Sequence, residues 1–327
     1  MSVPPEYGGG GHLRSWQAVV SFEAAYHDAP LIDTAAVLVA PTVLAFGSDE
    51  QRDRFLPAAT AGSCIACIAY TEAGAGSDLA NIAMTAADDG EDAFVLDGEK
   101  VLVTAAHKAD WCCTIARTDP SSKGSRGLSM FLVDMRTPGV EVERVPTANG
   151  WTLGTIHFEH ARVGTDTLLG ERDRGWRQLG AALTSDRSGM AWLGWASRNV
   201  RTLVDAFRGT SDVLARDALA DLTTRLFIGL RLAERVLRLQ DAGEAAVVEA
   251  AMSKVWATEL LQRIARVGDA LLGPGSILAP GWFGEVPLGS WFAYETVERL
   301  HPTLSVGANE IQRTTIGQVG LGLPREP

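Results

Sequence analysis

The sequence is short of aromatic residues, cysteine and positive charge, and each shortage excludes something. Aromatic residues make up 7%, and four cysteines occur in 327 residues. Lys and Arg number 29 against 40 Asp and Glu, which gives a net charge of −11. Nucleic acids and anionic membranes are bound through positive surfaces, so we expect neither as a partner.

Long apolar runs are also missing. The most apolar early stretch, Ala35 to Phe46, is short and interrupted by Pro41, and residues 1–11 contain no basic segment followed by an apolar one. We therefore expect no transmembrane segment, no signal peptide and a cytoplasmic location. In that compartment the four cysteines are expected to be reduced thiols.

Residues that could bind a metal do not gather in a recognisable pattern. Cys64 and Cys67 have the spacing of a zinc or redox pair, but no second pair or histidine cluster completes a site. His157 and His160 lie three apart in a strand-like segment, where their side chains face opposite ways. We expect no metal site and interpret the cysteines as small core residues.

What is present is the composition of a folded protein, with 46% hydrophobic and 21% charged residues. The pattern changes twice along the chain. Residues 16–57 are helical in pattern, residues 65–168 are rich in β-forming runs, and the helical pattern returns from Gly175 onward. We therefore expect an α+β protein in which a β-rich middle region separates two helical ones.

The middle region predicts a compact β-barrel or sandwich. Ala93–Leu96 and Val101–Thr104 are interpreted as two strands joined by an Asp97-Gly98 hairpin turn. Further strands, separated by Gly, Ser and Pro, are predicted at 111–116, 128–133 and 140–145.

The last region predicts a helical bundle. Three long, proline-poor stretches each pair an apolar stripe with a charged face, namely Leu183–Phe207, Val213–Leu239 and Ala245–Leu272. A last helix is expected to begin near Asn309 and to stop before Gly320.

The most informative motif is the loop Tyr70-Thr-Glu-Ala-Gly-Ala-Gly-Ser-Asp78. Gly74 and Gly76 permit a close approach of the backbone, while Thr71, Ser77 and nearby N–H groups can donate hydrogen bonds. Such a loop after a strand can cradle a phosphate or a flavin edge. Taken alone, it is also consistent with an ordinary tight turn.

Other segments occur with this loop in a fixed order, namely Val3–Gly9, Phe46–Pro57, Leu96–Lys100, Gly307–Arg313 and Leu321–Arg325. Together they resemble the acyl-CoA dehydrogenase family of flavoproteins from Val3 to the C-terminus. The resemblance implies a truncated N-terminal helical domain at 1–66, a middle β-barrel at 67–168 and a C-terminal four-helix bundle at 169–327.

The resemblance also implies bound FAD and oxidation of an acyl-CoA thioester to its 2,3-enoyl-CoA. A carboxylate removes the α-proton, the β-hydrogen leaves as hydride to the flavin, and electron-transfer flavoprotein or a similar acceptor takes the electrons. Matching positions imply FAD contacts at Tyr70, Thr71, Gly76, Ser77, Leu102, Val103, Thr104, Ala308, Asn309 and Glu310. Substrate contacts are implied at Ser77, Arg187 and Gly307.

Three positions depart from the family pattern, two of them near the cofactor and one at the catalytic base. Ala73 replaces the usual proline, and Leu102 stands where a tryptophan often lies against the flavin. The usual catalytic glutamate is replaced by Val306, which cannot abstract a proton. A subset of the family places the base directly before the arginine that matches Arg187, and that position is Asp186 here. Asp186 is either this base or a helix-start residue favoured by the helix dipole.

A further departure concerns the neighbouring subunit. The family's Arg-x-x-Phe-Gly segment, which reaches another subunit's FAD, is missing from residues 207–220. This resembles the short subunits of actinobacterial α2β2 dehydrogenases, so a homo- or hetero-oligomer is expected. The chain is then either a dehydrogenase or a non-catalytic subunit that completes a partner's FAD site. A flavin monooxygenase or carrier-protein oxidase of the same fold is a third alternative.

The family pattern normally places two helices before the segment that matches Val3–Gly9. We expect a partner subunit to cover the apolar surface that those helices would cover, with a misassigned start codon as the alternative.

Overall fold

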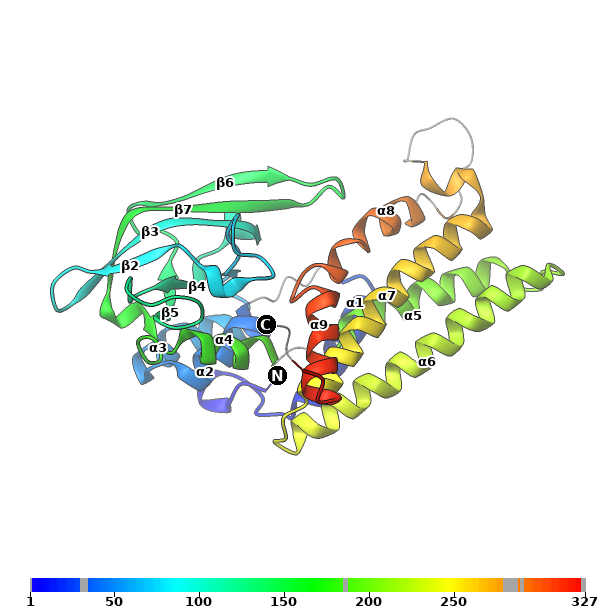
Figure 1. The fold of residues 1–327 in the computed structure, drawn as a ribbon. Helices are drawn as coiled ribbons and strands as arrows, with labels where there is room; N and C mark the ends of the chain where they lie inside the picture. The colour runs from blue at the N-terminus through cyan, green and yellow to red at the C-terminus, as the bar shows by residue number, and fades with distance from the viewer. Residues whose placement is uncertain (1, 30–34, 185–187, 279–287, 289–290, 325–327) are drawn as a thin grey trace. The chain divides into compact units, whose positions relative to one another are not determined.

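The computed structural model describes residues 2–29, 35–184, 188–278, 288 and 291–324. The chain divides into two compact units (Figure 1). Unit 1 comprises Met1–His12 and Ile32–Asp186, and unit 2 comprises Leu13–Leu31 and Arg187–Pro327. Each unit is described by itself below.

Unit 1 joins short helices to one sheet of eight strands. Its α-helices are α2 (Ala40–Phe46), α3 (Asp49–Thr60) and α4 (Gly175–Thr184). Its strands are β1 (Ala66–Ala69), β2 (Thr85–Asp88), β3 (Ala93–Thr104), β4 (Trp111–Arg117), β5 (Leu128–Asp134), β6 (Val140–Pro146), β7 (Thr152–Gly164) and β8 (Leu168–Leu169). The strand order is β6-β7-β3-β2-β4-β5-β8, with β1 paired in parallel to β4.

Helix α3 is placed by its sequence at both its start and its buried face. Ser48 and Gln51 form a capping box, in which each side chain binds the other residue's backbone N–H. Phe55 and Leu56 on this helix are fully buried, and the Phe55 ring meets Trp111 of β4 edge-on. This contact joins the helical layer to the sheet.

The predicted Asp97-Gly98 hairpin is wrong. β3 continues through both residues as one strand of 12 residues, paired with β7, and the hairpin lies between β2 and β3. Gly98 has φ +142° at a register shift, and a Cβ there would come within 2.9 Å of the Met84 Cα. Gly98 therefore forms part of a β-bulge that the Met84 backbone approaches closely, and it does not form a turn.

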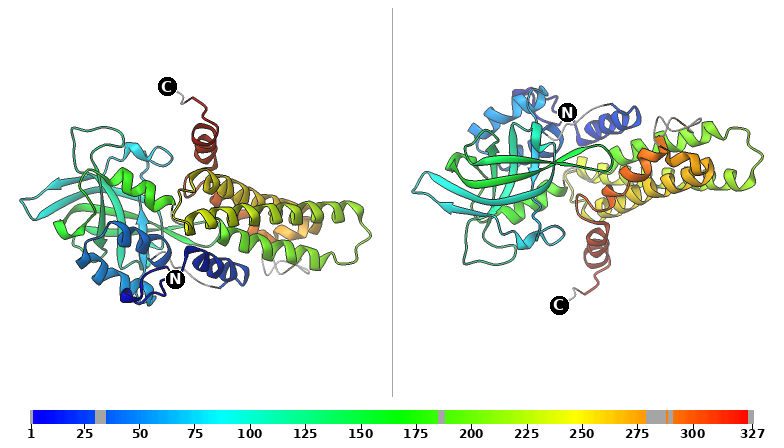
Figure 2. Two further views of the ribbon diagram at one scale, coloured as in Figure 1. Left: turned by 90° about the horizontal axis from the view of Figure 1, so that it is seen from below. Right: turned by 90° about the horizontal axis from the view of Figure 1, so that it is seen from above.

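Unit 2 is helical. It contains α1 (Arg14–Tyr26), α5 (Met190–Ala206), α6 (Val213–Asp241), α7 (Val247–Leu272), α8 (Trp291–Glu298) and α9 (Asn309–Thr315), and α9 continues into a π-helical turn at Ile316–Gly320. The three long helices lie side by side in both views of Figure 2. They confirm the predicted bundle helices, although α5 begins at Met190 rather than near Leu183.

Helix α1 precedes the sheet in the sequence but packs on the bundle helix α5. The contact is close at Gly194, where a Cβ would lie 2.4 Å from the Phe22 carbonyl oxygen and 2.9 Å from the Ala25 Cβ. Small residues at this crossing allow the two helix backbones to approach each other. The order predicted from the sequence, with a β-rich region between two helical ones, is confirmed. Helix α1 comes before the β-rich region in the sequence but belongs to unit 2.

Candidate functional site

The predicted site residues are divided between the units, since 70–104 fall in unit 1 and 307–310 fall in unit 2. Asp186 and Arg187 lie outside the described residues. The two groups of described residues are therefore examined separately.

The glycine loop leaves β1 and presents a row of backbone N–H groups. Reciprocal backbone hydrogen bonds between Glu72 and Ala75, of 3.2 and 3.0 Å, close its first turn. Ala73, Gly74, Gly76 and Ser77 are exposed, and within the described residues their N–H groups have no protein acceptor. A Cβ on either glycine would meet nothing within 4 Å. The loop thus offers donors beside open space, which suits an anionic group or a flavin edge.

A second predicted segment is held beside this loop. The N–H of Val101 on β3 donates to the Thr71 carbonyl oxygen at 2.9 Å. A register shift then falls between Lys100 and Val103, so that both of these side chains point into the core. Leu102 is left 62% exposed with φ +57°.

The bulge turns the side chains that follow Lys100. Without it, alternation would bury Leu102 and Thr104 with Lys100. Instead both are exposed, while Val103 packs inside the sheet. Leu102 and Thr104 can therefore contact a ligand through their side chains, whereas Val103 has only its backbone to offer.

A buried ion pair lies beneath the loop. Lys100 Nζ is 2.7 Å from Glu72 Oε1, and the two side chains are 0% and 9% exposed. The Glu72 carboxylate also accepts the N–H groups of Ala83 at 2.7 Å and Met84 at 3.1 Å. Burial lowers the pKa of Lys100, and the attraction of Glu72 opposes that shift. This pair was not predicted from the sequence, in which its one signal is a lysine inside a β-forming run.

Tyr70 points away from the loop surface. Its ring is buried, and its hydroxyl lies 3.5 Å from the Cys113 Sγ. Burial, and then the charge of the Cys113 thiolate form, raise the pKa of Tyr70 well above its ordinary 10.0. The Tyr70 side chain is therefore not available to a ligand at the loop.

In unit 2 the predicted residues surround the start of α9. Val306 and Gly307 both have left-handed backbone conformations, with φ +54° and +79°, and Ala308 is the N-cap. Val306, which stands in place of the family glutamate, is 43% exposed. A β-branched residue is unusual in this backbone region.

Asn309 is buried and its side chain anchors α9 to α7. Its Oδ1 accepts from Lys254 Nζ at 2.7 Å, and its Nδ2 lies 3.1 Å from both Thr258 Oγ1 and Glu259 Oε1. Lys254 is fully buried and was missed from the sequence, although it falls on the apolar face of α7 beside Ala250. Asn309 can reach a cofactor only through its backbone, while Glu310 is exposed.

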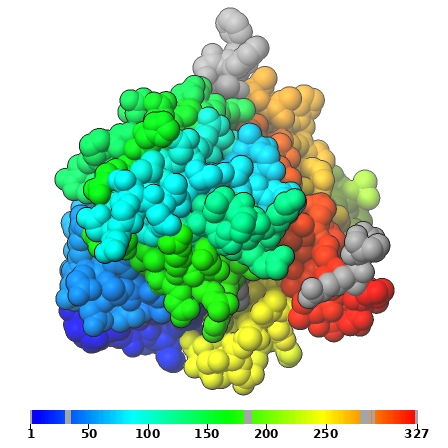
Figure 3. All heavy atoms as spheres, turned by 60° about the vertical axis from the view of Figure 1, so that its left-hand side comes forward, coloured from blue at the N-terminus to red at the C-terminus, as the bar shows by residue number. Residues whose placement is uncertain are grey.

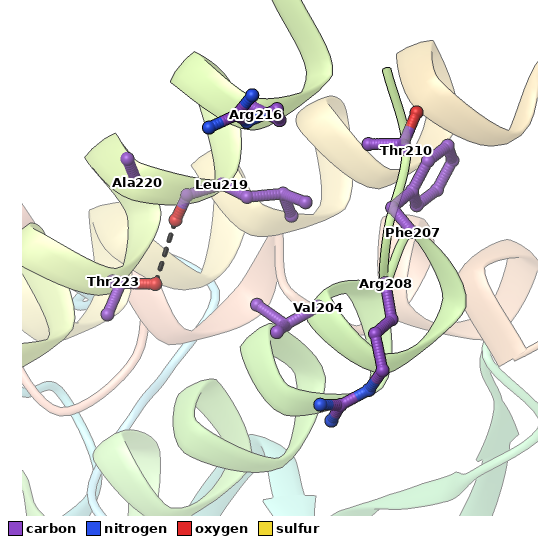
Figure 4. Close-up of a pocket in the computed structure, with 8 residues that line it drawn as sticks. All are labelled: Val204, Phe207, Arg208, Thr210, Arg216, Leu219, Ala220 and Thr223. Carbon is purple, nitrogen blue, oxygen red and sulfur yellow. Dashed lines mark hydrogen bonds between the residues drawn. The ribbon is translucent and has the colours of Figure 1, made fainter. Parts of the chain in front are cut away.

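A shallow groove between α5 and α6 contains none of the predicted site residues (Figure 4). Val204, Phe207 and Leu219 supply its apolar lining, and Arg208 and Arg216 also line it. This is the stretch in which the family's subunit-reaching segment is missing from the sequence.

Two further features concern the described residues alone. Among them, no three His, Cys, Asp or Glu side chains are grouped so as to hold a metal ion, and no helix is long and apolar enough to cross a membrane. His157 lies near Glu99 and Glu143, at 3.3 and 3.7 Å, whereas His160 contacts Asp97 at 2.6 Å.

Comparison with known proteins covers the whole chain. Family models for the acyl-CoA dehydrogenase N-terminal, middle and C-terminal domains match residues 1–63, 67–161 and 173–321. Acyl-CoA dehydrogenase FadE29 of Mycobacterium tuberculosis is 32% identical over 99% of this chain and 85% of its own. Acyl-CoA dehydrogenase IpdE1 of the same organism is 35% identical over 99% and 84%.

Solved structures agree with these matches. The Tcur3481-Tcur3483 steroid ACAD has a TM-score of 0.92 at 27% identity, over 99% of this chain and 85% of that one. The ChsE4-ChsE5 complex from Mycobacterium tuberculosis has a TM-score of 0.88 at 29% identity, over 99% and 86%. The chain therefore belongs to the acyl-CoA dehydrogenase family of flavoprotein oxidoreductases.

Proposed function

We propose that the chain is an FAD-dependent acyl-CoA dehydrogenase, or a subunit of one, that converts an acyl-CoA thioester to its 2,3-enoyl-CoA. The observation that carries this proposal is the set of open N–H donors at Ala73, Gly74, Gly76 and Ser77, whose loop is joined to the β3 segment of the exposed Leu102 and Thr104 by the Val101 hydrogen bond. Such donors suit the pyrophosphate and the polar edge of a flavin. FAD, when bound, supplies the acceptor for the β-hydride.

The residues of the proposed site differ in which of their groups, backbone or side chain, a ligand can reach. The loop would hold FAD through backbone N–H groups, and the exposed Leu102 and Thr104 side chains would contact it. We also propose FAD contacts at Ala308, Asn309 and Glu310 of unit 2. Substrate contacts come from Ser77, Gly307 and Arg187.

The proposed general base is Asp186, because Val306 cannot accept a proton at the position that the family usually uses. A base must lie within hydrogen-bond reach of the proton that it removes. Aspartate is one methylene shorter than glutamate, so its reach makes the rate sensitive to how closely the substrate is held. Electrons would then pass to electron-transfer flavoprotein or a similar acceptor.

The replacement Asp186→Asn tests this assignment. We expect the rate of anaerobic flavin reduction by an acyl-CoA to fall by about 10²–10⁴-fold, because general-base catalysis contributes a factor of that size. The FAD content should stay unchanged. The matched control is Glu171→Gln, which neutralises an exposed carboxylate and should leave the rate unaltered. An unaltered rate in Asp186→Asn would remove Asp186 from the base role.

A second candidate function is that of a non-catalytic subunit, and Val306 is the observation that favours it. Two similar structures, the Tcur3481-Tcur3483 enzyme and the ChsE4-ChsE5 complex, have two named components. We propose that this chain likewise forms a homo- or hetero-oligomer. FAD that binds only when a partner dehydrogenase is co-expressed would support the subunit role.

Oxygen consumption coupled to flavin reoxidation would instead indicate an oxidase or monooxygenase.

A further inference from the structure

The Lys100–Glu72 ion pair lies between two segments that reach the surface, the loop after Glu72 and the end of β3 at Leu102–Thr104. Glu72 opens the loop in which Ala73, Gly74, Gly76 and Ser77 are exposed. Lys100 precedes the bulge that exposes Leu102. Besides its 2.7 Å contact with Glu72, the Lys100 ammonium donates to the Tyr70 carbonyl oxygen at 3.3 Å. The pair thus fixes the loop to β3 at a buried point.

The Glu72 carboxylate extends this connection to a third segment. It accepts the N–H groups of Ala83 and Met84, which directly precede β2. The loop is therefore held at its start by Lys100 and beyond its end by residues 83–84. Figure 3 shows the part of the chain coloured cyan, which includes residues of β2 and β3, at the surface of unit 1.

Stability alone is a weak reason for such a pair. Removing two charges from water costs free energy that their attraction only partly returns, and apolar replacements of both partners are often neutral or stabilising. The Lys100 side chain is 0% exposed, so it cannot contact a ligand directly. Its distinguishing property is the set of backbone groups that it holds in one geometry.

We propose that Lys100 and Glu72 are positioning residues for the cofactor. They hold the N–H donors of Ala73, Gly74, Gly76 and Ser77 at a fixed offset from the Leu102–Thr104 segment, and without them the loop binds FAD poorly even in a folded protein. This inference rests on the proposed function, because it names residues that act on the same site.

The test compares FAD affinity with stability in the full chain. Apoprotein is titrated with FAD by quenching of flavin fluorescence, and its thermal unfolding is followed separately. The variants are Lys100→Met, Glu72→Gln and the double variant that carries both. The matched control is the exposed pair Arg172–Asp88 of the same unit, replaced as Arg172→Met with Asp88→Asn.

We expect each single variant to lower the Tm, because it leaves an unpaired buried partner. The double variant should recover most of the Tm yet bind FAD at least about tenfold more weakly, since a methionine and a glutamine at these two positions cannot hold the same backbone geometry. The exposed control pair should change neither quantity appreciably.

The inference is overturned if the double variant binds FAD as tightly as the wild type. Should the single and double variants fail to fold, Glu72→Asp decides, because it keeps both charges but shortens the reach to Ala83 and Met84. Wild-type affinity in folded Glu72→Asp would likewise overturn it. A wild-type chain that binds no FAD, alone or with a partner, would contradict the proposed function itself.

Discussion

Two residues of the candidate site adopt a backbone conformation that their side chains disfavour. Leu102 has φ +57° and Val306 has φ +54°. The left-handed region costs an L-residue about 1–2 kcal/mol, and such residues gather where function constrains the chain. In Leu102 the strain accompanies the bulge that exposes the side chain. In Val306 the strain falls in the segment before α9, at the position that matches the family glutamate.

The buried thiol of Cys113 makes the free energy of unfolding depend on pH in the alkaline range. Burial raises the pKa of Cys113 from an ordinary 9.0 to about 12. The folded state therefore keeps the Cys113 proton at pH values where the unfolded chain has lost it. The corresponding stabilisation is complete below pH 9 and is lost as the pH rises toward 12.

We predict that Cys113→Ala reduces the alkaline slope of the unfolding free energy by up to about 1.4 kcal/mol per pH unit above pH 9. Urea unfolding between pH 8 and 11 measures this slope for wild type and variant. Cys113→Ala also leaves a cavity, but that cost is independent of pH. Parallel slopes for the two proteins would contradict the prediction.

At the scale of elements, the sequence predicts the helices and strands whose residue pattern lies within the element itself. The long bundle helices were predictable because an apolar stripe recurs along each of them. The path of β3 was not, because Asp97-Gly98 is equally typical of a hairpin turn and of a bulge. The partner of α1 was not predictable either, since an amphipathic face does not specify which helix it covers. Gly194 becomes informative only once the two helices are seen to cross.

The bulge at Gly98 gives a prediction for this scale. Gly98→Ala should lower the unfolding free energy by about 2–4 kcal/mol, because it adds a disfavoured φ and a backbone clash with Met84. The control is Gly90→Ala, which has φ +75° in an exposed turn where a Cβ would meet only Asp92 Oδ1 at 3.8 Å. Its cost should be about 1–2 kcal/mol. Equal costs in urea unfolding would show that the close approach contributes nothing.

At the scale of the whole molecule, the site residues predicted from the sequence are divided between two units. The loop and the β3 bulge belong to unit 1, and the segment before α9 belongs to unit 2. The motif predicted the loop because glycine and serine spacing is a local signal. It could not predict Lys100 or Lys254 as buried anchors, because a charged residue in an amphipathic pattern is expected at the surface. Their partners, Glu72 and Asn309, are distant in sequence.

We propose that unit 1 carries a preformed FAD-binding loop. The most direct test is the flavin absorbance of the purified chain after incubation with FAD and removal of the free cofactor. We predict one FAD per chain, bound alone or in an oligomer with a partner dehydrogenase. A colourless protein in both preparations would contradict the claim.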